Sequence, residues 1–198
     1  MKKISKTILL FFLFILFSIS LILTIQNLNI LKKIIIDRNS KQQLSDDEKK
    51  EYLKLIFSNA NNFIEIQKFQ NIYFIARRNG TTLGIIKFIY KYIPCPLCND
   101  IFLVVSININ GRIHKIININ EIIANGKKIE RPRVEKFLEQ FKDVDYNTNI
   151  FNNEIIKNIK EAEKICYYIK TGISEFQYEV QRYELFSLYK VKILNYRF

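Results

Sequence analysis

The chain of 198 residues contains one histidine, His114, and only five glycines. A single histidine gives no basis for a Ser-His-Asp triad, and no HExxH zinc motif is present. The glycines form neither a P-loop nor a GxGxxG phosphate-binding motif. The sequence therefore carries no hydrolase or kinase signature, and these absences argue against an independent enzyme.

Runs of basic residues are also missing, although the formal net charge is +12. Positive charge attracts anionic lipid, nucleic acid or an acidic partner. Nucleic-acid-binding proteins, however, usually concentrate Lys and Arg in a stripe or a run. Here the basic residues are spread along a chain that is rich in Ile, Asn and Lys throughout, so we predict no nucleic-acid partner.

One segment near the N-terminus, TILLFFLFILFSISLILTI at residues 7–25, carries no charge. Its length is about that needed to cross the hydrocarbon core of a membrane as a helix. A cleaved signal peptide is the alternative, but neither a small-x-small cleavage site nor a lipobox cysteine follows. We therefore predict an uncleaved transmembrane signal-anchor at residues 7–27.

The anchor defines the expected topology of the rest of the chain. Lysines within residues 1–6 favour a short cytoplasmic N-terminus. Residues 28–44 would form a juxtamembrane spacer, and residues 45–198 a single domain on the extracytoplasmic side of the cell membrane. Basic residues in the spacer argue for the opposite orientation, which stays open.

The domain begins with a capping box, Ser45-Asp-Asp-Glu48, and apolar residues at helical spacing predict a helix over residues 46–59. Several β-prone runs follow, interrupted by Asn79-Gly80 and Asn110-Gly111. Each dipeptide fits a type I′ turn, because both central residues of that turn must accept positive φ. These signals predict a meander of four or five antiparallel strands that ends at Ile119.

Helical spacing returns after Gly126. Pro132 marks one helix start, where its missing N–H costs nothing. A second helix is expected from Ile155 to Cys166 and onward to an end near Thr171-Gly172, and a third from Ser174. No internal repeat and no second domain boundary interrupt the domain. The pattern predicts an α+β fold, in which helices pack on an antiparallel meander sheet.

Four segments follow one another in a recognisable order: LKLIFSNANNFIEI, NIYFIARRNGTTLGIIKF, DIFLVVSININGRIHKIININE and VEKFLEQFKDV. Together they resemble the FMN-binding domain family, the extracytoplasmic flavoprotein domains of sodium-translocating NADH:quinone reductase and of related ferredoxin-dependent complexes. The resemblance covers about residues 50–190. It implies FMN as the cofactor and electron transfer beside the subunits of a membrane redox complex.

The family's Ser/Thr-Gly-Ala-Thr motif falls on Thr171-Gly172-Ile173-Ser174. The resemblance implies that Thr171, Gly172 and Ser174 hold the flavin phosphate. FMN would be bound without a covalent link, or joined to Ser174 through a phosphodiester that a separate flavin transferase makes. The sequence departs from the family in having Ile173 in place of Ala and in lacking the preceding Asp.

Two interpretations of this segment follow from its residues alone. A glycine before a helix start presents free N–H groups to a phosphate. Alternatively, Gly172 ends one helix and Ser174 caps the next, with no ligand involved.

Cys95-Pro-Leu-Cys98 is a CxxC sequence at a strand junction. Oxidised in an exported domain, the pair would close a short disulfide loop; reduced, it would offer a reactive thiol with a lowered pKa. With Cys166 and His114 it would complete a Cys₃His set, but zinc sites normally show paired, regular spacing, so we predict no metal. Cys166 is expected in the core, and His114 is expected to be structural.

Three functions stay open at this stage. The first is a membrane-anchored, extracytoplasmic, FMN-binding-like domain that takes part in electron transfer. The second is a flavin-free structural or assembly subunit of a membrane complex. The third is a thiol-redox protein that uses Cys95 and Cys98.

Overall fold

The computed structural model describes most of the chain, namely residues 16–18, 20, 21, 23–26 and 44–186. In this part of the chain, no helix is both long and apolar enough to span a membrane. Most of the anchor predicted at residues 7–27 lies outside the described residues. The chain divides into two units between Glu48 and Lys49.

The capping box at Ser45 is confirmed. The Glu48 N–H donates to Ser45 Oγ over 3.3 Å, and the Ser45 N–H donates to Glu48 Oε2 over 2.8 Å. The backbone hydrogen bond from Ser45 lowers the pKa of the Glu48 carboxyl. Helix α2 (Asp46–Ile56) follows and ends three residues before the predicted boundary, because the chain turns at Phe57 with Ala60 N–H bonded to its carbonyl.

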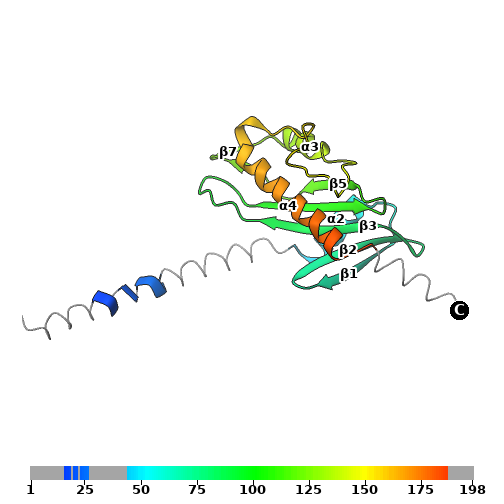
Figure 1. The fold of residues 1–198 in the computed structure, drawn as a ribbon, viewed down its shortest axis with the longest axis horizontal. Coiled ribbons are helices and arrows are strands. Elements are labelled where there is room, and N and C mark those ends of the chain that lie inside the picture. Colours follow the sequence, from blue (N-terminus) through cyan, green and yellow to red (C-terminus); the bar gives the residue numbers. More distant parts are fainter. Residues whose placement is uncertain (1–15, 19, 22, 27–43, 187–198) are drawn as a thin grey trace, which may run out of the picture. The chain divides into compact units, whose positions relative to one another are not determined.

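The predicted meander is confirmed, with five strands that lie in chain order and are all antiparallel (Figure 1). Sequential pairing means that each strand is joined to the next by a short connection. The strands are β1 (Asn62–Lys68), β2 (Asn71–Arg78), β3 (Thr81–Lys91), β4 (Ile101–Asn108) and β5 (Ile113–Asn118). A separate two-stranded ribbon is formed by β6 (Ile123–Ala124) and β7 (Lys127–Lys128).

The two Asn-Gly dipeptides form different turns. Asn79 and Gly80 have φ of 49° and 82°, and they connect β2 to β3 as a type I′ turn requires. At the second dipeptide only Gly111 has positive φ, so the predicted type I′ turn is wrong there. The reason is Asn108, whose side-chain oxygen accepts from the N–H groups of Asn110 and Arg112 and supports a longer loop.

The central strands contain runs of consecutive apolar residues, whose side chains point alternately to opposite faces of the sheet. Both faces are therefore apolar, and helices cover both. On one face the buried side chains pack beneath α3 (Arg131–Glu139) and α4 (Glu163–Arg182); they include Tyr73, Ile85, Ile89, Leu103 and Val105. On the other face they pack against α2 and the turn after it; they include Phe74, Ala76, Ile86 and Val104. The α+β fold with helices on a meander sheet is therefore present as predicted.

The C-terminal helices differ from the prediction. Residues 155–159 are not helical, a 3₁₀ turn occupies Lys160–Ala162, and α4 then continues without a break through Gly172. Glycine inside a helix costs about 1 kcal/mol relative to alanine, which suggested a helix end here. Burial of Gly172 and Ile173 against the sheet outweighs that cost.

The C-terminal half of α4 is fixed to the sheet by a polar cluster around Glu179. Its carboxylate accepts from Tyr73 Oη at 2.9 Å and pairs with Lys87 Nζ at 2.5 Å. Asn71 Nδ2 donates to its second oxygen. Both ionic side chains are largely buried, so the pair holds the helix in one register over β2 and β3.

Candidate functional site

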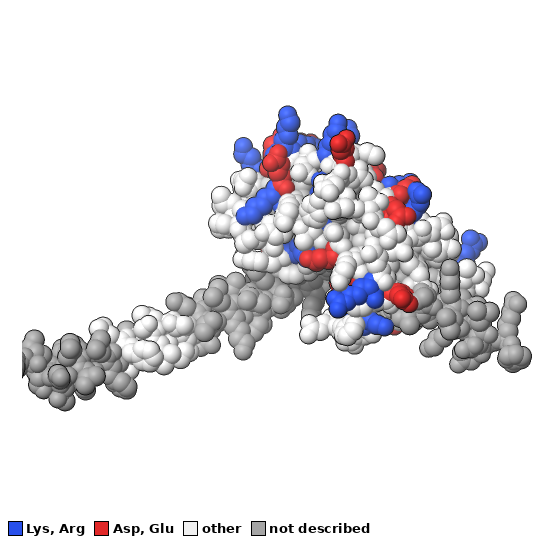
Figure 2. All heavy atoms as spheres, in the orientation of Figure 1, with Lys and Arg blue, Asp and Glu red and all other residues white. Residues whose placement is uncertain are grey.

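The face of the molecule in Figure 2 shows no concentration of charge of one sign. On the face in Figure 2, Lys and Arg side chains alternate with Asp and Glu, and white areas separate the groups. This distribution lacks the continuous basic stripe that a nucleic-acid interface usually shows on such a face.

The residues predicted to hold a flavin phosphate lie in the interior of α4. Thr171 Oγ1 donates to the carbonyl of Tyr167 one turn earlier. Backbone N–H groups in a helix interior bond to carbonyls four residues before them, so none is free to bind phosphate. The interpretation of Gly172 and Ser174 as a helix start is therefore wrong, and so is the alternative in which they join two helices.

Gly172 has a packing role instead. It is buried, and a Cβ atom there would lie 3.0 Å from Ile89 Cγ2 and 3.3 Å from Lys91 Cε. The missing side chain lets α4 lie close on β3. The structure brings Thr171, Gly172 and Ser174 together on one helix but shows no phosphate-binding geometry among them.

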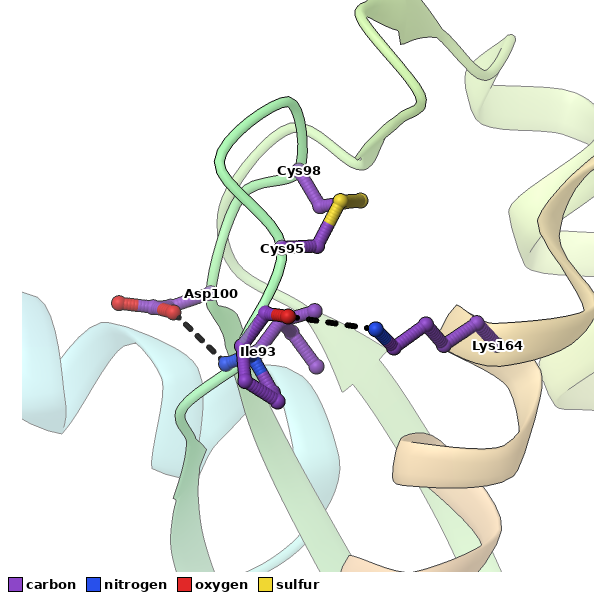
Figure 3. The surroundings of a disulfide bond; sticks show 6 residues. Ile93, Cys95, Cys98, Asp100 and Lys164 are labelled. Atoms are coloured by element: carbon purple, nitrogen blue, oxygen red, sulfur yellow. Dashed lines mark hydrogen bonds between the residues drawn. A yellow bond between two sulfur atoms is a disulfide. The ribbon is translucent and has the colours of Figure 1, made fainter.

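Cys95 and Cys98 are joined by a disulfide, with their Cα atoms 5.2 Å apart (Figure 3). They lie in the loop that connects β3 to β4, at the edge of the domain core. Of the sequence-based alternatives for this pair, the structure shows the oxidised one. The Cys98 N–H also donates to the Cys95 carbonyl over 3.2 Å, as in a tight turn.

Asp100 closes the base of this loop. Its Oδ1 accepts from the Ile93 N–H at 2.9 Å, and its Oδ2 accepts from Tyr90 Oη at 2.6 Å. Its own carbonyl accepts from Asn120 Nδ2 at 2.6 Å. Asp100 is only 8% exposed, and these contacts join the residue just before β4 to the end of β3, to the start of the loop and to the segment after β5.

Two neighbouring elements hold the loop from its sides. From the β6–β7 ribbon, the Gly126 N–H donates to the Leu97 carbonyl, and Asn99 donates its N–H to the Ile123 carbonyl. From the first turn of α4, Lys164 Nζ donates to the Pro94 carbonyl at 3.2 Å, as Figure 3 shows. The conformation of the loop therefore rests on hydrogen bonds at both flanks as well as at its base.

The disulfide is near the protein surface. Both cysteines are half-buried, Pro94 and Pro96 are exposed, and Leu97 between the cysteines is 61% exposed. The side chains of both cysteines also pack against the core cluster on the α4 face of the sheet. The disulfide therefore lies between that core and the exposed residues of its loop.

Sequence reasoning identified the cysteines but missed the residues that position them. Asp100 follows Cys98 by two residues, and its place directly before a β-prone run was the available signal. Lys164 is 66 residues beyond Cys98 in the sequence (164 − 98). Nothing local in the sequence connects Lys164 to the loop; only the packing of α4 does so.

The third cysteine and the histidine lie elsewhere. Cys166 is fully buried on the α4 face of the sheet, and burial raises the pKa of its thiol. His114 stacks on Phe57 with ring centroids 4.6 Å apart, and its Nε2 contacts the Ile56 carbonyl on the α2 face. The described residues contain no group of three or more His, Cys, Asp and Glu side chains placed to hold a metal ion.

A groove of about 940 Å³ follows the outer edge of β5. Its walls come from β5, α3 and the end of α2, with Ile117, Ile119 and Leu138 among the lining residues. The first residue of β5, Ile113, already bonds to the segment at Asp143 and Val144. Neither the disulfide loop nor the predicted phosphate-binding segment contributes to the groove.

No protein-family model matches this chain, and no curated protein matches it.

Proposed function

We propose that the chain is a membrane-tethered, extracytoplasmic redox module whose electron-carrying group is the Cys95–Cys98 pair. One observation carries this proposal: the disulfide lies in a surface loop whose conformation is already maintained by hydrogen bonds to Asp100, Gly126 and Lys164. A loop held in this way keeps its two sulfur atoms close in both oxidation states. The cysteines can then open and re-form their bond with little rearrangement.

A purely structural role explains the disulfide less well. Closing a ring of four residues, Cys95 to Cys98, removes only about 1.9 kcal/mol of chain entropy from the unfolded state. In the chain-entropy model longer rings remove more entropy from the unfolded chain, so a ring of four residues is among the least stabilising cross-links. The hydrogen bonds of the loop already provide much of the local order that such a short cross-link adds.

The chemistry is a two-electron exchange. A dithiol donor transfers two electrons and two protons to the disulfide, which becomes two thiols, while the donor becomes a disulfide. Oxidation of the reduced pair by a disulfide acceptor reverses these steps. The tether predicted at residues 7–27 would keep this exchange beside the membrane and its redox complexes.

A second candidate is flavin-dependent electron transfer with FMN, as the family resemblance implies. Two observations favour it. The segments on which the resemblance rests fold as a helix, a five-stranded meander and two later helices, in that order, with the β6–β7 ribbon between the meander and α3. The groove beside β5 also has the volume of a typical small-molecule site. The interior position of Thr171, Gly172 and Ser174 in α4 argues against those residues as the phosphate site.

A redox titration of the full-length protein in detergent tests the first proposal. The fraction of Cys95 and Cys98 in the thiol form is measured by alkylation across a range of dithiol-to-disulfide ratios. We expect a reversible two-electron transition above about −300 mV, since structural disulfides typically lie below that value. A pair that stays oxidised throughout would favour the structural or assembly subunit instead.

The same preparation tests the flavin candidate. Bound FMN gives the purified protein a yellow colour and flavin fluorescence, which persists after denaturation when the link is covalent. Colourless protein that takes up no added FMN would exclude the flavin candidate without affecting the disulfide titration. The Ser174→Ala variant is the control for a covalent link at that residue.

A further inference from the structure

β5 is an edge strand of the sheet, and its outer side is only partly covered. The segment after α3 pairs with its start: the Ile113 N–H donates to the Val144 carbonyl over 2.9 Å, and the Asp143 N–H donates to the Ile113 carbonyl over 2.8 Å. Among the described residues, no other segment pairs with this side of β5. The rest of the strand therefore presents unpaired backbone groups to the groove along its edge.

Two residues of β5, Ile116 and Asn118, direct their backbone N–H and C=O groups into this groove. Their neighbours face β4, because the N–H and the carbonyl of Lys115 both bond to the Ser106 hydroxyl, and the Ile119 N–H donates to a carbonyl of β4. Backbone hydrogen-bonding groups alternate sides along a strand, so those of Ile116 and Asn118 point away from β4. A ligand in the groove meets two donors and two acceptors at the spacing of a β-strand.

The groove has an apolar wall on each side of the strand. On the α3 side its lining includes Val134, Leu138 and Ile116. On the α2 side it includes Ile117 and Leu55, which is 53% exposed. Side chains of an extended chain point alternately to opposite sides. A chain paired with β5 would therefore place successive side chains against the two walls in turn.

The charges along the groove are close to balanced. The lining contains four basic and three acidic side chains: Lys115, Lys128, Arg131, Lys142, Glu121, Glu135 and Glu139. Lys128 pairs with Glu121, Arg131 pairs with Glu135, and Lys115 Nζ donates to the Leu55 carbonyl. A charged group that entered the groove would lose hydration without gaining a free partner of opposite sign from these pairs. The lining therefore favours an uncharged ligand.

We propose that the groove binds an extended, uncharged and largely apolar segment of a partner protein, which adds to the sheet as a strand beside β5. Backbone hydrogen bonds to Ile116 and Asn118 hold the segment, and the two apolar walls receive its alternating side chains. A second copy of this chain fits less well, because its own β5 is flanked by the same two walls. The inference does not depend on the proposed disulfide function, since neither cysteine lines the groove.

The probe is a rhodamine-labelled pentapeptide, Thr-Val-Ile-Val-Thr, blocked at both ends. Its binding to the full-length protein in detergent is measured by fluorescence anisotropy, with empty micelles as the background. Two N-methylated versions carry the methyl groups either on both valines or on the isoleucine. A strand donates to one neighbour from every second amide, so only one version keeps the amides that face β5. We expect one version to lose affinity about tenfold or more, and the other to stay within about threefold of the parent.

Two variants of the protein test the same geometry. I116P removes an N–H group that faces the groove but none that faces β4, and proline is tolerated at such edge positions. L55E places a charge on the α2 wall at an exposed helix position, so it keeps the test valid when I116P does not fold. Each should lower the affinity about tenfold. The matched control is L97E, which changes a similarly exposed leucine on the disulfide loop and should bind as wild type does.

Hydrogen exchange of backbone amides distinguishes the occupants. Without peptide, the Ile116 and Asn118 amides should exchange fast and the Ile119 amide slowly, and the peptide should protect the first two. Protection of both in the protein alone would show that the chain itself or a second copy covers β5, and would overturn the proposal. So would equal losses with the two N-methylated peptides, or a parent peptide that does not bind at about 1 mM. Displacement of the probe by FMN would assign the groove to the flavin candidate instead.

Discussion

Removal of both sulfur atoms in the C95S/C98S variant should cost little stability. The ring that the disulfide closes has four residues, and the chain-entropy relation gives about 1.9 kcal/mol at 25 °C for that length. The hydrogen bonds from Ile93 to Asp100 and from Gly126 to Leu97 do not involve sulfur. We therefore expect the variant to keep the loop conformation and most of its stability.

The matched comparison is D100A, which leaves the disulfide intact but removes the buried acceptor for two donors. Asp100 accepts from Ile93 N–H and Tyr90 Oη, and each unsatisfied buried group costs about 1–3 kcal/mol. D100A should therefore destabilise the protein more than C95S/C98S does. Comparing the two losses of stability shows whether the hydrogen bonds of Asp100 or the disulfide contribute more to the stability of the protein.

The stability of both variants is measured by urea unfolding and by thermal melts of the full-length protein in detergent. A loss of about 1 kcal/mol lowers the Tm of a chain of this size by about 2–4 °C. For C95S/C98S we therefore expect a fall in Tm of about 4–8 °C. Hydrogen exchange of the Asn99 and Gly126 amides should stay slow. A loss above about 4 kcal/mol, or fast exchange at both amides, would show that the disulfide is a structural cross-link and would refute the reasoning.

Two further predictions concern packing and pH. A Cβ at Gly84 would lie 2.4 Å from the Ile107 backbone oxygen, so G84A should cost about 2 kcal/mol or more in urea unfolding. G172A should cost less, since its closest contact is a methyl group of Ile89 at 3.0 Å and alanine favours the helix; a larger cost than in G84A would contradict this. Burial and a hydrogen bond to a carboxylate on α4 raise the pKa of Tyr73 far above its usual 10.0. Above pH 10.0 the folded protein keeps Tyr73 neutral while Tyr73 ionises in the unfolded chain. The contribution of Tyr73 to the free energy of unfolding is therefore complete below pH 10.0 and is lost progressively as the pH rises above it. Between pH 10.5 and 11.5 the wild-type free energy of unfolding should fall about 1.4 kcal/mol per pH unit more steeply than that of Y73F, and parallel slopes would refute this.

Much of the fold followed from the sequence, because its signals are local. Ser45 and Glu48 cap α2 through contacts between residues three apart, and the period-two runs gave the strands of the meander. Asn79-Gly80 formed the expected turn for the same reason. At Asn110-Gly111 a side chain just outside the dipeptide changed the turn, so the local rule failed there.

The candidate site, likewise, could be predicted from the sequence only in part. The CxxC spacing placed Cys95 and Cys98 together, since only two residues separate them. The predicted helix boundary at Gly172 is wrong, because packing against β3 keeps Gly172 inside α4. Burial against the sheet is a long-range effect that no window of local sequence contains.

The amino-acid sequence by itself determined an α+β meander and a pair of cysteines close enough to bond, because both depend on neighbours along the chain. Only the tertiary structure decided what surrounds that pair: the β6–β7 ribbon on one side and Lys164 on the other. These groups are far apart in sequence and meet because α4 and the sheet bury their apolar faces against each other.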